Sequence, residues 1–190
     1  MLMSFSTLEN SVVKLRAPEP DDVDMLYAWE NNMEIWKASN TVTPFSRYVL
    51  KKYIETSHLD IWETKQLRLV IEAKTQSSLM MVPVGLVDLF DFDPFHLRAG
   101  IGILIANKEY RQKGYATEAL SLLVRYSFET LQLHQLYCNI SADNKVSIQL
   151  FANAGFACVG TKKEWIKGVD GWKDEMMFQL LNPLNSLAKS

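Results

Sequence analysis

The sequence has few cysteines and no excess of basic residues, and each shortage excludes a class of protein. Only two of the 190 residues are cysteine, and Cys138 and Cys158 stand in apolar surroundings without the spacing of metal ligands. We therefore expect reduced thiols in a cytoplasmic protein, with no disulfide and no metal site. The formal net charge of −2 argues against a nucleic-acid-binding protein, whose surface would be basic.

Signals for membranes and export are lacking too. The longest uncharged apolar stretch, residues 99–106, is far too short to span a bilayer, so we expect no membrane association. The first five residues have neither the basic region nor the long apolar region of a signal peptide. Neither a repeat nor a low-complexity tract nor a linker divides the chain. We therefore expect one domain over residues 1–190, with its core at about 12–181.

Apolar periodicity predicts an α/β (α+β) protein. The expected strands are residues 12–17, 67–72, 82–92, 97–106, 135–141, 156–165 and 172–181, and the expected helices are 22–31, 47–57, 117–131 and 144–154. Residues 75–78 and 93–95 read as turns, and the glycines at 168 and 171 predict a hairpin. Residues 32–44 read as irregular, either a lid or a surface connection. This order predicts a mixed sheet with helices on both faces.

A strand, a glycine-containing turn and a helix follow one another between residues 99 and 120. The first N–H groups of a helix lack intrahelical partners, and the helix dipole places positive charge there, so the pattern favours an anion such as pyrophosphate. Arg111 and Lys113 add charge, and Gly114 has no Cβ to obstruct the approach of a phosphate. Neither G-x-x-x-x-G-K-[ST] nor G-x-G-x-x-G occurs at this turn.

The turn Arg111-x-x-Gly114-x-Ala116 resembles the [Q/R]-x-x-G-x-[G/A] signature of the GNAT superfamily of acetyl-CoA-dependent N-acetyltransferases. The resemblance covers about residues 12–180 and is closer to the bacterial spermidine/diamine acetyltransferases. It is carried by residues 13–17, 22, 30–32, 85–89, 109–110, 113–117, 136–137, 144–145, 155–156 and 166–168. It implies the GNAT fold, a mixed, mostly antiparallel sheet of about six to seven strands with a splayed central pair.

The resemblance implies transfer of the acetyl group of acetyl-CoA to a primary amine, with a small polyamine or diamine as acceptor. Two alternatives stay open: an enzyme that acetylates protein N-termini, as the ribosomal-protein relatives do, and a CoA-binding module that has lost catalysis. We also expect a homo-oligomer. Relatives carry a further acid where this sequence has Gly100, and their Glu-rich loop is replaced by a segment with Trp36. A different amine, held by an aromatic pocket of Trp29, Trp36, Trp62 and Phe92, therefore remains an alternative acceptor.

Cofactor contacts are implied at three places by the same resemblance. Backbone groups of Leu104, Ile105 and Ala106 would pair with the pantetheine. The pyrophosphate would lie on the amides of Arg111, Gln112, Lys113, Gly114, Tyr115, Ala116 and Thr117. Asn144, Lys145 and Ser147 would lie beside the cofactor, and Asn144 is also suited to cap the following helix. Relatives place a tyrosine that protonates the leaving thiolate where this sequence has Phe151, whose ring carries no proton to donate.

Asp88 and Asp91 are the candidate catalytic residues, because acids at these positions face the cationic substrate in the polyamine enzymes that the chain resembles. Strand alternation predicts Asp88 and Phe90 on one face of the sheet and Asp91 and Asp93 on the other. A carboxylate there can attract an ammonium group and accept its proton. The alternative is a solvated strand end, with Asp93 starting the turn that follows.

Overall fold

The computed structural model describes residues 8–39, 41–56, 59–75, 80–168 and 170–183. Seven strands form one sheet in the order β1-β2-β3-β4-β5-β7-β6. Their bounds are β1 Val13–Arg16, β2 Leu67–Lys74, β3 Met81–Asp93, β4 Arg98–Ile105, β5 Gln135–Ser141, β6 Ala157–Gly168 and β7 Gly171–Leu181. Neighbouring strands are antiparallel except β4 and β5, which are parallel. This confirms the mixed, mostly antiparallel sheet.

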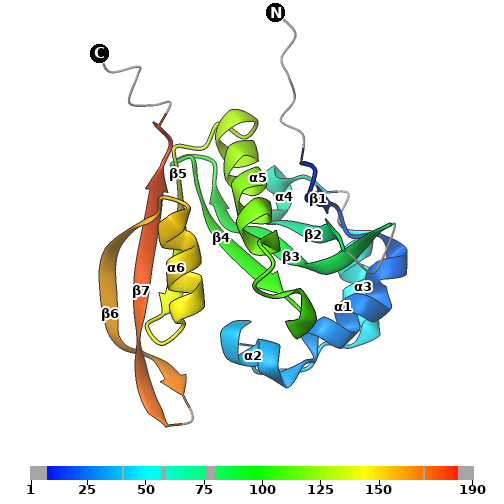
Figure 1. Ribbon diagram of the computed structural model, residues 1–190, viewed down its shortest axis with the longest axis horizontal. Coiled ribbons are helices and arrows are strands. Elements are labelled where there is room, and N and C mark those ends of the chain that lie inside the picture. The colour runs from blue at the N-terminus through cyan, green and yellow to red at the C-terminus, as the bar shows by residue number, and fades with distance from the viewer. Residues whose placement is uncertain (1–7, 40, 57–58, 76–79, 169, 184–190) are drawn as a thin grey trace, which may run out of the picture.

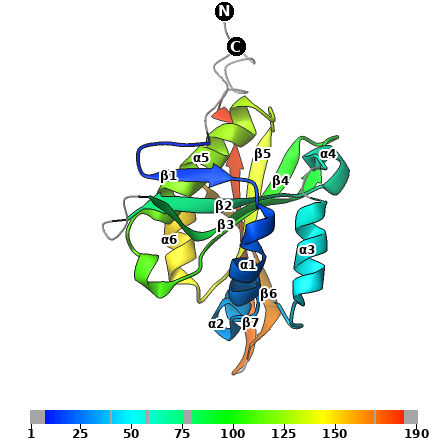
Figure 2. The same cartoon turned by 90° about the vertical axis from the view of Figure 1, so that its right-hand side faces the viewer.

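Helices cover both faces of the sheet, as predicted. They are α1 Val23–Glu30, α2 Met33–Ser39, α3 Arg47–Glu55, α4 Ile61–Thr64, α5 Tyr115–Glu129 and α6 Lys145–Asn153, with short 3-10 turns η1 Pro20–Asp22 and η2 Lys108–Tyr110. In the two views α5 and α6 lie against one face, and α1 and α3 lie against the other (Figures 1 and 2). Each face therefore has its own apolar core.

Two short helices correct the sequence prediction. Residues 32–44, expected to be irregular, contain α2, because the Asn32 side chain accepts the Glu34 amide and Ile35 is buried. The single turn of α4 begins at Asp60, whose carboxylate accepts the amides of Trp62 and Glu63. One turn is too short to show periodicity. Of the expected turns, residues 76–78 and 169 lie outside the described residues, while Gly168 and Gly171 pair as the ends of the hairpin.

The core on the α5 face joins both ends of the sheet. Leu120 and Leu123 of α5 are fully buried in one apolar cluster with Val87 of β3, Leu136 of β5 and Phe178 of β7. A smaller cluster on the other face joins α1 and α3 to the sheet, through Leu26, Leu50, Ile54, Val70 and Leu86. Burial of these side chains supplies the main stabilisation of the fold.

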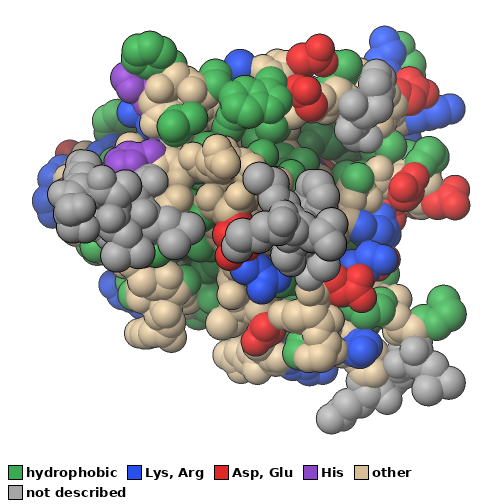
Figure 3. Space-filling model, turned by 90° about the horizontal axis from the view of Figure 1, so that it is seen from above, with side chains coloured by type: hydrophobic (Ala, Val, Ile, Leu, Met, Phe, Trp, Pro, Cys, Tyr) green, Lys and Arg blue, Asp and Glu red, His purple; other side chains and the backbone are tan. Residues whose placement is uncertain are grey.

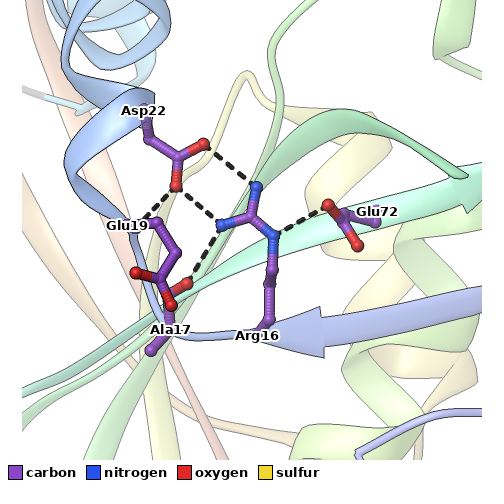
Figure 4. A network of polar contacts seen from close by, with 5 residues as sticks. All are labelled: Arg16, Ala17, Glu19, Asp22 and Glu72. Carbon is purple, nitrogen blue, oxygen red and sulfur yellow. Dashed lines mark hydrogen bonds and ion pairs between the residues drawn. The ribbon is translucent and has the colours of Figure 1, made fainter.

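An arginine fixes the entry into α1 (Figure 4). Arg16, the last residue of β1, binds both carboxylate oxygens of Asp22 through its terminal nitrogens at 2.6 and 3.0 Å, and its Nε donates to Glu72 of β2. Burial alone would raise the pKa of Asp22, but the hydrogen bonds from Arg16 and from the Glu19 amide lower it. The network joins β1, β2 and the start of α1.

The surface carries both signs of charge. On the face seen from above, acidic and basic side chains are interspersed and form no continuous patch of one sign (Figure 3). Within the described ranges, the structure contains no helix long and apolar enough to cross a membrane.

Candidate active site

The central parallel strands separate soon after they begin. β4 and β5 pair through three residues each, Arg98 to Gly100 with Gln135 to Tyr137. Beyond this joint β5 follows β7, and the two strands diverge in Figure 1. A cleft of about 1100 Å³ lies between the two parts of the sheet, lined by Ile103 of β4, Asn139 of β5 and Phe151 of α6 among others. The splayed pair expected from the sequence is present.

Alternate residues of β4 turn their backbone groups into this cleft. The Leu97 carbonyl accepts the Gln135 amide, whereas the Ala106 amide donates to Val84 of β3, so odd-numbered residues face β5 and even-numbered residues face β3. Past the joint, Ile103 and Ile105 therefore direct N–H groups into the cleft.

Of the three residues expected to pair with the pantetheine, only Ile105 turns its amide toward the cleft. The alternation turns the backbone groups of Leu104 toward β3. Arg111 binds the carbonyls of Ile105 and Ala106, through Nε and Nη2 at 3.1 Å each. Ile103, which the sequence did not single out, directs its amide to the same side as Ile105 and lines the cleft.

The start of α5 presents unpaired amides. Gln112 and Gly114 have φ of 60° and 84°, and the first amide of the helix with a backbone partner is that of Glu118, which donates to the Gly114 carbonyl. In the described part of the chain, the six amides of residues 112–117 donate to no protein group. A Cβ on Gly114 would meet no atom within 4 Å, so the space over the turn is open.

This turn fits the diphosphate of acetyl-CoA. Six unsatisfied amides at the positive end of a 15-residue helix suit an anion that can accept several hydrogen bonds. The Arg111 side chain instead fastens the turn to the end of β4. The Lys113 ammonium lies 5.7 Å from the Tyr110 ring centroid, and the Tyr115 hydroxyl donates to the Lys74 carbonyl. The amides, more than these side chains, are therefore available to bind an anion.

The start of α6 forms the far wall of the cleft. Asn144 caps the helix by accepting the Ser147 amide at 3.1 Å, and both residues line the cleft. The Lys145 ammonium donates to the Ala142 carbonyl. Phe151 is buried, lines the cleft and contacts the Phe156 ring edge-to-face at 5.1 Å. The residue thus lies at the cleft wall as an apolar group.

Asp91 lies at the joint between β4 and β5, in a bulge of β3. Phe90 pairs with Gly100 and Asp93 with Arg98, so β3 has one extra residue here, and Asp91 has φ of 49°. The Tyr137 hydroxyl donates to Asp91 Oδ2 at 3.4 Å, and the Phe90 ring lies edge-on to the Tyr137 ring.

The predicted alternation is therefore wrong beyond Phe90, because the bulge brings Phe90 and Asp91 to the same tyrosine. Burial, together with the charge of Asp91, raises the pKa of Tyr137, which keeps the phenol protonated at neutral pH. Asp93 accepts the amides of Phe95 and His96, as expected of a turn-starting residue.

Asp88 is not a free carboxylate. Arg68 of β2, its register partner, donates to Asp88 at 2.7 Å and to Glu30 of α1 at 2.6 Å. Burial lowers the pKa of Arg68, but Asp88 and Glu30 raise it by more, so the guanidinium stays charged. The three side chains line a cavity of about 190 Å³ together with Gly102 and Ile103. Sequence reasoning missed Arg68, although an arginine directly opposite an acid is a recognisable cross-strand pair.

The aromatic pocket considered as an alternative for the acceptor does not form. Phe92 belongs to the core on the α5 face and contacts the ring of Trp62 at 4.8 Å, whereas Trp29 is buried in the core on the opposite face. Of the four aromatic residues only Trp36 lines the cleft. The sheet separates Trp29 from Trp62 and Phe92, because residues on opposite faces of a sheet cannot form one pocket.

Cys138 lines the cleft but is not suited to act as a nucleophile. Burial raises the pKa of its thiol to about 12, so the thiolate is scarce at neutral pH. Cys138 is therefore not a candidate to carry the acetyl group as a covalent intermediate.

Known proteins share this arrangement. A family model described as "Acetyltransferase (GNAT) domain" matches residues 13–157. The chain belongs to the GNAT acetyltransferase family. It is therefore an N-acetyltransferase that uses acetyl-CoA, as the resemblance implied.

Relatives within the GNAT family include polyamine enzymes. The spermidine N(1)-acetyltransferase of Escherichia coli K12 is 30% identical over 151 residues, which cover 78% of this chain and 74% of that protein. The structure of Vibrio cholerae spermidine N-acetyltransferase with CoA and spermine has a TM-score of 0.78 at 26% identity, covering 91% of this chain and 97% of that one. A dodecameric structure of the V. cholerae enzyme has a TM-score of 0.74 at 24% identity, covering 95% and 99%.

Proposed function

We propose that the acetyl group passes to a small aliphatic amine with more than one amino group. The observation that carries the proposal is the set of carboxylates on the cleft wall, those of Glu34, Asp143, Asp170 and Glu175. Two of them already bind ammonium groups of the protein, Asp143 that of Lys173 and Glu175 that of Lys162. Carboxylates that bind lysine side chains can bind the ammonium groups of an acceptor amine in the same way. The names of the spermidine N-acetyltransferase relatives support the same class of acceptor.

Each part of the site has a task in this proposal. The amides of residues 112–117 hold the diphosphate, and the amides of Ile103 and Ile105 align the pantetheine along β4. Acetyl-CoA, when bound, supplies a thioester as the acetyl donor. A backbone N–H of β4 that faces the cleft can donate to the oxygen on which negative charge develops during attack.

In this proposal Asp91 binds the ammonium group of the acceptor and removes its proton. An amine attacks only as the neutral base, so its ammonium proton must leave first. Asp91 is exposed at the joint of β4 and β5, where it can bind the ammonium group and accept or relay this proton. Tyr137 orients the carboxylate by donating to Oδ2. Asp88 cannot accept a proton in the same way while Arg68 binds it. We therefore propose that Asp88, together with Glu30, holds Arg68 in place at the wall of the smaller cavity.

A homo-oligomer is part of the proposal. The dodecamer formed by the V. cholerae enzyme, which shares the fold, is its support.

The decisive experiment is release of the CoA thiol from acetyl-CoA with a panel of acceptors. Polyamines and diamines are expected to give turnover well above alkyl monoamines, amino acids and short peptides. Turnover with peptides alone would favour an enzyme for protein N-termini. Binding of acetyl-CoA without thiol release for any amine or peptide would point instead to a CoA-binding module.

A further inference from the structure

A lysine of the protein itself is held as an acceptor amine would be held. Lys162 of β6 donates through Nζ to Oε2 of Glu175 on β7, and the same ammonium lies 4.9 Å from the centroid of the Trp165 ring. A carboxylate together with an aromatic face is the combination that recognises alkylammonium groups. Glu175 and Trp165 both line the cleft between the diverging strands.

Glu175 is the buried carboxylate of this group. Its side chain is 10% exposed, although β6, the neighbouring edge strand, is largely exposed. A buried carboxylate needs a charged partner, because removal from water without one is costly. Lys162 is that partner here, with a side chain that is 34% exposed and free to withdraw toward solvent.

A bulge in β6 brings the ring to the ammonium. Lys162 pairs with Glu175 and Ile166 with Lys173, so β6 has two more residues than β7 over this stretch. In a regular strand, Lys162 and Trp165 would point to opposite faces, since they are three residues apart. Glu164 has φ of 48°, and its amide donates to Asp174 at 3.0 Å, which fixes the bulge. The bulge therefore places Trp165 beside Lys162.

We propose that Glu175 and Trp165 form a subsite for the distal ammonium group of a long polyamine acceptor, which binds there in place of Lys162. The inference rests on the proposed function and deepens it by selecting among amines. Glu175 pairs with Ser141, which is four residues along β5 from Tyr137 at the joint. At the rise of a strand this is about 13 Å. A long polyamine spans that length between its end nitrogens, and a short diamine does not.

The test is a comparison of KM values for a long polyamine and an alkyl monoamine. Glu175→Gln is expected to raise KM for spermine roughly tenfold and to leave KM for the monoamine and for acetyl-CoA within about twofold, because a charge-assisted hydrogen bond is lost only by the long acceptor. Lys162→Met, which removes the internal competitor, is expected to lower KM for spermine severalfold.

The double variant Lys162→Met/Glu175→Gln should show the same KM for spermine as Glu175→Gln alone, since the gain depends on the carboxylate. Matched controls are Lys52→Met, which removes an ammonium group lying over the Tyr48 ring on α3, and Asp24→Asn, which removes a surface carboxylate paired with Arg47. Both should leave all KM values within about twofold. Equal thermal unfolding of each variant shows that the fold is kept.

Two results would overturn the subsite. One is a KM for spermine that Glu175→Gln leaves unchanged, and the other is an equal change for spermine and for the monoamine. If the unmodified enzyme releases no thiol with any amine, the proposed function is rejected, and the subsite must be tested by binding alone. Calorimetric titration of spermine into the enzyme and into Glu175→Gln then tests the subsite alone, and equal affinities reject it.

Discussion

Asp88 and Asp91 are three residues apart on β3 but have different surroundings. Arg68 neutralises Asp88, while Asp91 is exposed and accepts only the phenol of Tyr137 at 3.4 Å among the described residues. Asp91→Asn is therefore expected to lower kcat/KM for the amine at least tenfold, with the affinity for acetyl-CoA unchanged. Asp88→Asn should chiefly lower the stability, because it leaves Arg68 with one carboxylate partner. Steady-state kinetics and thermal unfolding of both variants distinguish the two roles.

Phe151 lies where relatives place a proton donor, and the structure puts its ring on the cleft wall. Phe151→Tyr adds a phenol with a pKa of about 10 near the leaving thiolate, so we expect kcat at saturating amine to rise roughly tenfold. Phe156→Tyr is the matched control, because Phe156 is its buried edge-to-face partner. That change should cost stability through an unpaired hydroxyl and leave kcat unaltered. No increase for a stable Phe151→Tyr enzyme would mean that the thiolate leaves without an acid here.

At the scale of elements, the turn before α5 depends on one glycine. Gly114 has φ of 84°, and a Cβ there would enter the open space over the unpaired amides. Gly114→Ala should weaken CoA binding tenfold or more, because the methyl group occupies the place of the phosphate. Gly155→Ala is the control, since Gly155 has a similar φ of 88° at the end of α6 and bears equal backbone strain. Calorimetric affinities that fall equally for both variants would contradict this site for the diphosphate.

The link between β1, β2 and α1 depends on Arg16. Arg16→Met leaves Asp22 without its strongest partner, and we expect a loss of about 1–2 kcal/mol at neutral pH, reduced by solvent screening of the partly exposed pair. The pKa of Asp22 is lowered in the folded protein, so its contribution is present above the unfolded pKa of about 3.9 and is lost as the pH falls through the folded value. Urea unfolding should therefore show a smaller difference between variant and parent once the pH falls below the folded pKa of Asp22. A constant difference would indicate lost packing only.

Much of the fold follows from periodicity, and the exceptions have local causes. The strand at 135–141 was predicted to the residue, because its alternating side chains face one core. The sequence did not predict the helices α2 and α4, because each is only one or two turns long. Each begins at a side-chain cap, which the pattern of apolar residues does not show. The bulges at Asp91 and Glu164 were not predicted either, since extra residues in one strand depend on how its neighbour pairs with it. The first bulge positions Asp91 at the joint, and the second positions Trp165 beside the cleft.

On the scale of the whole molecule, the sheet consists of two parts that share three residue pairs. β5, β6, β7 and α6 form a continuous stretch of sequence, while β1 to β4 pair among themselves. Between the parts, backbone hydrogen bonds are few, and the α5-face core provides most of the connection. The cleft exists because this joint is short.

The short joint between β4 and β5 also affects local unfolding of the protein. A contiguous segment with few backbone bonds to the remainder is the kind of unit that unfolds and exchanges its amide hydrogens cooperatively, ahead of global unfolding. The ladder of β5 with β7 can thus report a different opening free energy from the ladder of β2 with β3. A molecule bound in the cleft touches both parts and acts as a removable cross-link between them. Occupancy of the active site would then be readable as slower exchange in strands far from any substrate atom.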